Sequence, residues 1–195
     1  KDSCPANANI IAVGGFDSVT NIQNNLQKAL YSTNLNHKIN INPITTLLTD
    51  ISNDNKNKLL LSLFGENVNY QVYQTDFYNE CSESSSESTS CKVLQKSIEL
   101  TTLKNIALST IKESGSQIST ADIIINVAKS IEEIIDKTDT SIDFKENEIL
   151  TNLISDTVSR SKEIEPEIVI DDQNFSVIAS AAAKVIDQIQ TIDIT

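Results

Sequence analysis

Apolar side chains recur every three or four residues through most of the chain after position 41, a spacing that places them on one face of an α-helix. The predicted helices span residues 42–51, 54–64, 91–113, 119–135, 143–158 and 171–189. Each apolar stripe covers about a third of the helix surface, as expected for helices that share one core. The pattern predicts a mainly α fold, a multi-helix bundle of about six helices.

Residues with strong preferences for helix ends support these boundaries. Asn42 and Pro43 are typical of an N-cap and of the first helical position. Gly65 is predicted to end the helix before it, because glycine accepts the left-handed conformation at a helix C-terminus. Ser119 and Asp143 are predicted to cap the helices that follow them.

Residues 1–41 have no sustained helical pattern and are predicted to form an extended N-terminal segment, followed by a helical domain at residues 42–195. A β-prone run before Gly14 consists of Ile10, Ile11, Ala12 and Val13. Residues 19–31 have some helical spacing. We therefore expect an extended or short β segment ahead of the bundle.

Charge and composition exclude several classes of partner. The chain has 15 basic and 27 acidic residues, a net charge of -12, so it lacks the clustered cations that bind nucleic acid or an anionic membrane surface. No apolar run approaches the ~20 residues that span a bilayer, so no membrane insertion is predicted. The chain does not begin with methionine and lacks a basic, apolar leader, so we expect a removed signal peptide or a fragment.

Two of the three cysteines, Cys81 and Cys91, flank a Ser-rich segment without apolar residues. A disulfide that closes this 81–91 loop stabilises the fold by about 3 kcal/mol in the chain-entropy model and indicates an oxidising compartment. The alternative is a pair of unrelated reduced thiols. Cys4 is left over, and it is either free, paired with one of the other two, or bonded to a neighbouring chain.

Residues for catalysis are missing from the sequence pattern. His37 is the only histidine, and it lies in a polar, Asn-rich stretch that offers no nucleophile–base–acid arrangement. Glu163, Glu165 and Glu167 alternate around Pro166 without aromatic neighbours, so they are interpreted as a solvated linker. We predict no enzymatic activity and no cofactor.

Calcium is the one ion that stays open as a weak possibility, and no metal ligands are assigned. The carboxylates in question fall in two predicted loops and are Asp136, Asp139, Asp143, Asp171 and Asp172. Their spacing is not that of an EF-hand, and helix capping accounts for most of them.

Several short motifs occur in an order that resembles a helical module of very large secreted bacterial surface proteins. The motifs are Gly14-Gly15-Phe16-Asp17, Asn42-Pro43-Ile44-Thr45-Thr46-Leu47-Leu48, Ala121-Asp122-Ile123 and the Ala-rich stretch 179–183. In those adhesin-like proteins the module occurs beside immunoglobulin-like and cadherin-like domains. The Cys81–Cys91 segment and the low alanine content depart from its pattern. The resemblance implies a secreted, extracellular or cell-surface structural role, with no catalytic residues.

Two function hypotheses follow. The first is a surface-displayed or self-associating subunit of a filament, coat or adhesin, whose partners are copies of itself or neighbouring surface-protein domains. Its candidate intersubunit contacts are Cys4 and the run Ile10, Ile11, Ala12 and Val13, which could pair with a neighbour's exposed edge. The alternative is a secreted helical protein that binds a small apolar ligand or a host or partner protein.

Overall fold

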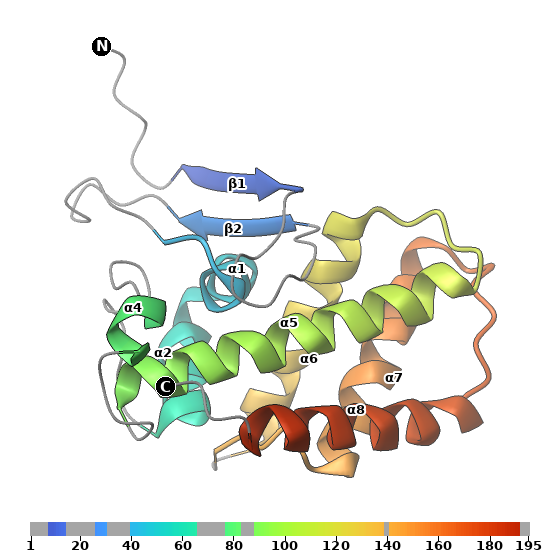
Figure 1. Cartoon of the computed structure of the whole chain (residues 1–195). Coiled ribbons are helices and arrows are strands. Elements are labelled where there is room, and N and C mark those ends of the chain that lie inside the picture. The colour runs from blue at the N-terminus through green and yellow to red at the C-terminus, as the bar shows by residue number, and fades with distance from the viewer. Residues whose placement is uncertain are drawn as a thin grey trace.

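The structure, a computed structural model, describes residues 8–14, 26–30, 40–65, 77–82, 88–138 and 141–191. It is mainly helical, with a short two-stranded antiparallel sheet near the N-terminus (Figure 1). The elements in chain order are β1 (Asn9–Val13), β2 (Leu26–Leu30), α1 (Pro43–Asp50), α2 (Asn53–Phe64), α4 (Phe77–Ser82), α5 (Thr89–Glu113), α6 (Thr120–Lys137), α7 (Asn147–Ile164) and α8 (Gln173–Thr191). The predicted fold class is confirmed.

The helices enclose one aliphatic core. Helix α5 crosses the molecule with α8 alongside it, and it also contacts α1, α2, α6 and α7 (Figure 1). The largest side chains sealed from solvent are Phe144, Ile44, Leu48, Leu59, Leu60, Leu103, Ile111, Ile123, Ile131, Leu150, Leu153 and Ile154. They come from every helix except α4 and α8 and from the segment before α7, so the apolar stripes seen in the sequence converge on one core.

Local capping fixes several helix starts as predicted. Asn42 accepts a hydrogen bond from the Thr45 backbone amide, and the Thr45 hydroxyl accepts one from the Asn42 amide, which completes a capping box. Ser119 accepts from the Asp122 amide at the start of α6. At the end of α2, Gly65 adopts a φ of 70°, which residues with a Cβ rarely tolerate.

Two local predictions are wrong. Asp143 does not cap a helix: it accepts a hydrogen bond from the Lys145 amide in a turn, and α7 begins at Asn147 after an N-cap residue without a side-chain cap. The weak helical spacing at 19–31 also misleads, because Leu26–Leu30 is a strand, and the rest of that segment lies outside the described residues. Five residues with mixed spacing fit either structure, and pairing with β1 decides between them.

Candidate functional site: a clamped two-stranded sheet

The β-prone run of the sequence forms β1, which pairs antiparallel with β2. Ile11 lies opposite Lys28, and Ile10 lies opposite Ala29. The sheet forms one end of the molecule, with β2 between β1 and α1 (Figure 1). Ala29 is completely buried, whereas Ile11 and Val13 are 55% and 73% exposed. The sheet therefore has a buried strand and an exposed one.

The edge of β2 that faces α1 is closed by two threonine hydroxyls. The backbone amide of Lys28 donates to Thr46 Oγ1 at 2.9 Å, and Thr45 Oγ1 donates to the Lys28 carbonyl oxygen at 2.9 Å. Thr46 Oγ1 in turn donates to the Asn42 carbonyl oxygen at 2.8 Å. The hydroxyls thus supply the partners that a third strand would supply in a wider sheet.

The side chain of Lys28 completes this attachment. Its Nζ atom lies 2.7 Å and 2.9 Å from the two carboxylate oxygens of Asp50, the last residue of α1. Both side chains are about nine-tenths buried. A buried ion pair of this kind is strongly destabilised when one partner is removed. We call Lys28, Thr45, Thr46 and Asp50 the strand clamp.

The position of the clamp determines which backbone groups of β1 point away from β2. Because the amide and carbonyl of Lys28 point to α1, Lys28 and Ile11 form a non-hydrogen-bonded pair, and the Ile11 amide and carbonyl point away from β2. The same alternation directs the backbone groups of Asn9 and Val13 outward. No element of the described ranges pairs with this outer edge. The sheet has one closed edge and one open edge.

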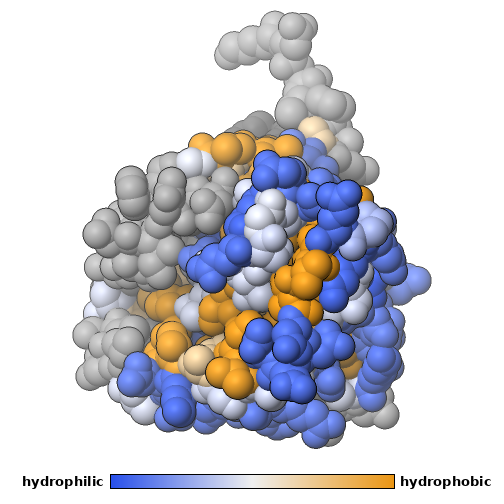
Figure 2. All heavy atoms as spheres, turned by 90° about the vertical axis from the view of Figure 1, so that its right-hand side faces the viewer, coloured by the Kyte–Doolittle hydropathy of each residue, from blue (hydrophilic) through white to orange (hydrophobic). Residues whose placement is uncertain are grey.

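The resulting surface is chemically simple. The open edge offers alternating amide donors and carbonyl acceptors together with the exposed side chains of Ile11 and Val13. Figure 2 shows hydrophobic surface at the upper end of the molecule, where the sheet lies. An edge of this kind is a template for an added strand. It carries no nucleophile, acid or base.

The clamp is the part of the site that the sequence interpretation missed. The pattern predicts only that Thr45 and Thr46 lie in the first turn of a helix, and it assigns no role to Lys28. The available signal was a pair of β-branched hydroxyl residues in the first turn of a helix, where threonine has poor intrinsic helix propensity. Their almost complete burial shows that they serve a tertiary contact.

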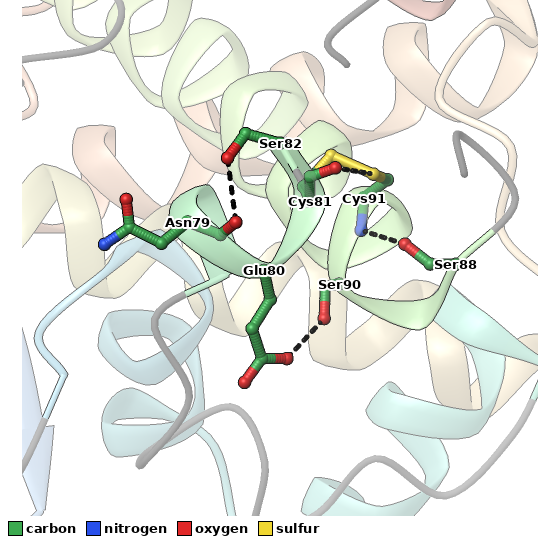
Figure 3. The surroundings of a disulfide bond; sticks show 7 residues. All are labelled: Asn79, Glu80, Cys81, Ser82, Ser88, Ser90 and Cys91. Carbon is green, nitrogen blue, oxygen red and sulfur yellow. Dashed lines mark hydrogen bonds between the residues drawn. A yellow bond between two sulfur atoms is a disulfide. The ribbon is translucent and has the colours of Figure 1, made fainter. Parts of the chain in front are cut away.

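Cys81 and Cys91 form a disulfide that joins α4 to α5, with a Cα–Cα distance of 4.7 Å (Figure 3). Both residues are almost completely buried. The helical region reaches further into the Ser-rich segment than predicted, since α5 starts at Thr89 and Ser88 accepts a hydrogen bond from the Cys91 amide. Cys4 lies outside the described residues.

Three of the carboxylates considered for calcium, Asp136, Asp143 and Asp171, have protein partners. Asp136 accepts hydrogen bonds from Lys58 Nζ at 3.0 Å and from Asn55 Nδ2 at 3.1 Å, and the bond from Lys58 is the main cause of its lowered pKa. Asp171 accepts from the Gln173 amide at the start of α8. Asp139 is outside the described ranges, and within them His, Cys, Asp and Glu side chains form no group of three that could hold a metal ion.

Glu165 lies in the connection between α7 and α8, as the linker interpretation predicts, but it also has specific hydrogen-bond partners. Its carboxylate accepts hydrogen bonds from Ser116 Oγ and from the Gln117 amide, in the loop that joins α5 to α6. These bonds, with that from Ser116 first, lower the pKa of Glu165. Glu165 thus links the α7–α8 connection to the α5–α6 loop, which lies far away in the sequence.

A small cavity adjoins the core. Where α1, α5 and α6 meet, there is a cavity of about 30 Å³, enough for little more than a water molecule. Lys104 lines this cavity, is 6% exposed, and its Nζ atom has no hydrogen-bond partner among the described residues. Burial lowers the pKa of this amine.

Two of the larger hollows that are open to the surface lie beside α8 and between α6 and α7. One, of about 680 Å³, lies between α5, the α7–α8 connection and α8 and includes Val169, Ile170 and Ile178. Figure 2 shows the hydrophobic side chains gathered on this face among hydrophilic ones. The other, of about 550 Å³, lies between α6 and α7 and is lined mostly by hydroxyl and charged side chains.

Among the described residues, every helix is too short or too polar to cross a lipid bilayer. Comparison with protein-family models, with curated proteins and with solved structures found no match to this chain.

Proposed function

We propose that this chain is a structural module of an extracellular or cell-surface assembly, and that it associates by adding a β-strand at the open edge of β1. The observation that carries the proposal is the asymmetry of the sheet. One edge is closed by Thr45 and Thr46, whereas the other presents the backbone groups of Ile11 without a partner in the described chain. Such a sheet accepts a strand on one side only.

Within the described part of the chain, the open edge lacks the devices that proteins use to prevent strand addition. Edges are commonly protected by charged side chains, by proline or by a covering element. β1 contains Asn9, Ile10, Ile11, Ala12 and Val13, so it has neither charge nor proline, in a chain with 22% charged residues. Its two exposed large apolar side chains, Ile11 and Val13, are β-branched, which favours pairing in a sheet.

The clamp connects this edge to the rigid part of the molecule. A force applied to β1 passes to β2, and through Lys28 to α1. Helix α1 is in turn anchored by Ile44 and Leu48, which are almost completely buried in the core. A module that bears load in an assembly needs such a connection between its contact strand and its core.

Two further observations support an extracellular setting. The Cys81–Cys91 disulfide is typical of proteins that fold in an oxidising compartment. The order of the Gly14-Gly15 and Asn42–Leu48 motifs resembles that of the surface-protein module.

Sedimentation over a wide concentration range tests the proposal by comparing the wild-type chain with Ile11→Pro. Proline removes only an outward-facing amide, and edge positions of this type tolerate it, so the monomer fold is expected to persist. We expect the wild-type chain to associate and Ile11→Pro to remain monomeric with an unchanged circular dichroism spectrum. Ile11→Val, which retains the amide and the β-branched shape, is the matched control and should associate. Equal association of all three chains would overturn the proposal.

A second candidate function, binding an apolar segment of a partner protein, is favoured by the open hollow beside α8. Val169 and Val185 are 85% and 43% exposed there. If this hollow is the contact, association will survive Ile11→Pro and be lost in Val169→Glu.

A further inference from the structure

We propose that the added strand is β1 of a second copy, antiparallel to the first, with Ile11 opposite Ile11 of that copy. This inference rests on the proposed function and names its partner. The resulting unit is a dimer with two-fold symmetry and a continuous four-stranded sheet, in the order β2, β1, β1 of the second copy and β2 of the second copy.

The backbone of the open edge is self-complementary. Its outward-facing residues are Asn9, Ile11 and Val13, which are symmetric about Ile11. A two-fold axis at Ile11 places Asn9 opposite Val13 of the other copy. All three positions then become hydrogen-bonded pairs, in which each residue exchanges both of its backbone bonds with the residue opposite. The pairing leaves no outward group of Asn9, Ile11 or Val13 without a partner.

The side chains of β1 also suit a second copy. The two Ile11 side chains lie directly opposite each other, a cross-strand contact between β-branched residues that stabilises antiparallel pairs. Two copies that each carry a net charge of -12 repel one another, so a contact between them requires a surface without acidic groups. β1 is such a surface, and the one cation opposite it, Lys28, is already neutralised by Asp50.

The strand clamp limits the sheet of the dimer to four strands. In the four-stranded sheet, both outer edges belong to β2 strands, and at each Lys28 the threonine hydroxyls already occupy the outward amide and carbonyl. The isologous contact is therefore closed and cannot extend the sheet further. A filament built from this dimer requires a second contact elsewhere on the molecule.

Disulfide trapping tests the register. In hydrogen-bonded antiparallel pairs the Cα atoms lie about 5.5 Å apart, within the range that a disulfide spans. In a Cys4→Ser background, where the remaining cysteines are bonded to each other, we expect Ile11→Cys to form a covalent dimer on mild oxidation. Asn9→Cys and Val13→Cys should cross-link with each other when mixed but not when oxidised separately. Ala12→Cys, two positions out of register with itself, is the matched control and should remain monomeric.

The outcomes separate this inference from the proposed function. If Val13→Cys cross-links with itself when it is oxidised separately, the two strands pair in another register. If every variant cross-links with itself when oxidised separately, the strands are parallel. Either result overturns the inference. If no variant cross-links while Ile11→Pro still abolishes association, the edge binds in another manner, so the inference fails and the proposed function stands. If no variant cross-links and Ile11→Pro has no effect, both fail.

Discussion

The backbone amide of Lys28 lies 2.9 Å from Thr46 Oγ1, so the side chain of a helix satisfies a hydrogen-bond donor of a strand. The Asn42–Leu48 motif thereby serves two purposes. Asn42 and Thr45 cap α1, and the hydroxyls of Thr45 and Thr46 hold β2. A motif that looks like a simple helix start is also the joint between the sheet and the bundle.

Thr46→Val tests this joint, because valine keeps the β-branched shape and removes the hydroxyl. The amide of Lys28 then stays buried without a partner, which we expect to lower the free energy of unfolding by about 1–3 kcal/mol. Thr49→Val is the control, since the Thr49 hydroxyl donates to the Thr45 carbonyl oxygen of its own helix. Urea titrations measure both. A loss for Thr46→Val no larger than for Thr49→Val would show that the joint contributes nothing.

The Lys28–Asp50 pair is expected to couple strongly. In a double-mutant cycle, Lys28→Met or Asp50→Leu alone leaves an uncompensated buried charge and should cost about 3–5 kcal/mol, whereas the double variant should recover much of this loss. The exposed pair Asp143–Lys145, at 3.8 Å, is the control, with coupling below about 1 kcal/mol. Additive losses at Lys28 and Asp50 would contradict the prediction.

The helices were predictable because their information is local. The apolar spacing in α5, α6 and α8, together with the cap at Ser119, follows from neighbouring residues alone. The clamp was not predictable in this way. Lys28 meets Thr46 across 18 positions of sequence, and no period or capping rule connects them.

The same limit explains why the partner of Glu165 and the role of Asp143 do not follow from the pattern. The pattern groups Glu165 with its acidic neighbours, but its partner Ser116 lies 49 residues earlier. Asp143 has the composition of a cap, yet its carboxylate is used within its own turn, and Phe144 inserts into the core before α7 begins. A tertiary hydrogen bond at Glu165 and the burial of Phe144 beside Asp143 outweigh the local preference.

The disulfide is expected to contribute about 3 kcal/mol of stability through loop closure. Replacing both Cys81 and Cys91 by Ala should lower the urea midpoint and destabilise α4 first, because α4 packs mainly on α5. Dithiothreitol should lower the urea midpoint of the wild-type chain by a similar amount and leave that of the double variant unchanged. If the reductant does not change the midpoint of the wild-type chain, the disulfide is not a source of stability.

Glu165 is expected to make the free energy of unfolding depend on pH in the acid range. Its pKa is lowered in the folded chain, so its contribution is present above the ordinary value of 4.5 and is lost as the pH falls through the lower, folded value. Glu165→Gln should therefore unfold at lower urea than the wild-type chain at neutral pH, and the two curves should converge under acid conditions. Glu163→Gln, an exposed neighbour, is the control and should leave the urea midpoint at neutral pH unchanged. A difference between the Glu165→Gln and wild-type chains that persists at low pH would mean that lost packing, rather than charge, is responsible.

The buried amine of Lys104 is expected to lower the free energy of unfolding. Its amine is buried without a partner and its pKa is lowered, because burial removes the solvation of the charged form. Between that lowered value and the ordinary 10.5, the unfolded chain binds more protons than the folded chain, so stability rises with pH in this window. Lys104→Met, of similar length, should raise the free energy of unfolding at neutral pH by about 1–3 kcal/mol and flatten this alkaline rise. Lys92→Met on the exposed side of α5 is the control, with no expected change of either kind. Destabilisation by Lys104→Met would instead indicate that the amine holds a buried water in the adjoining 30 Å³ cavity.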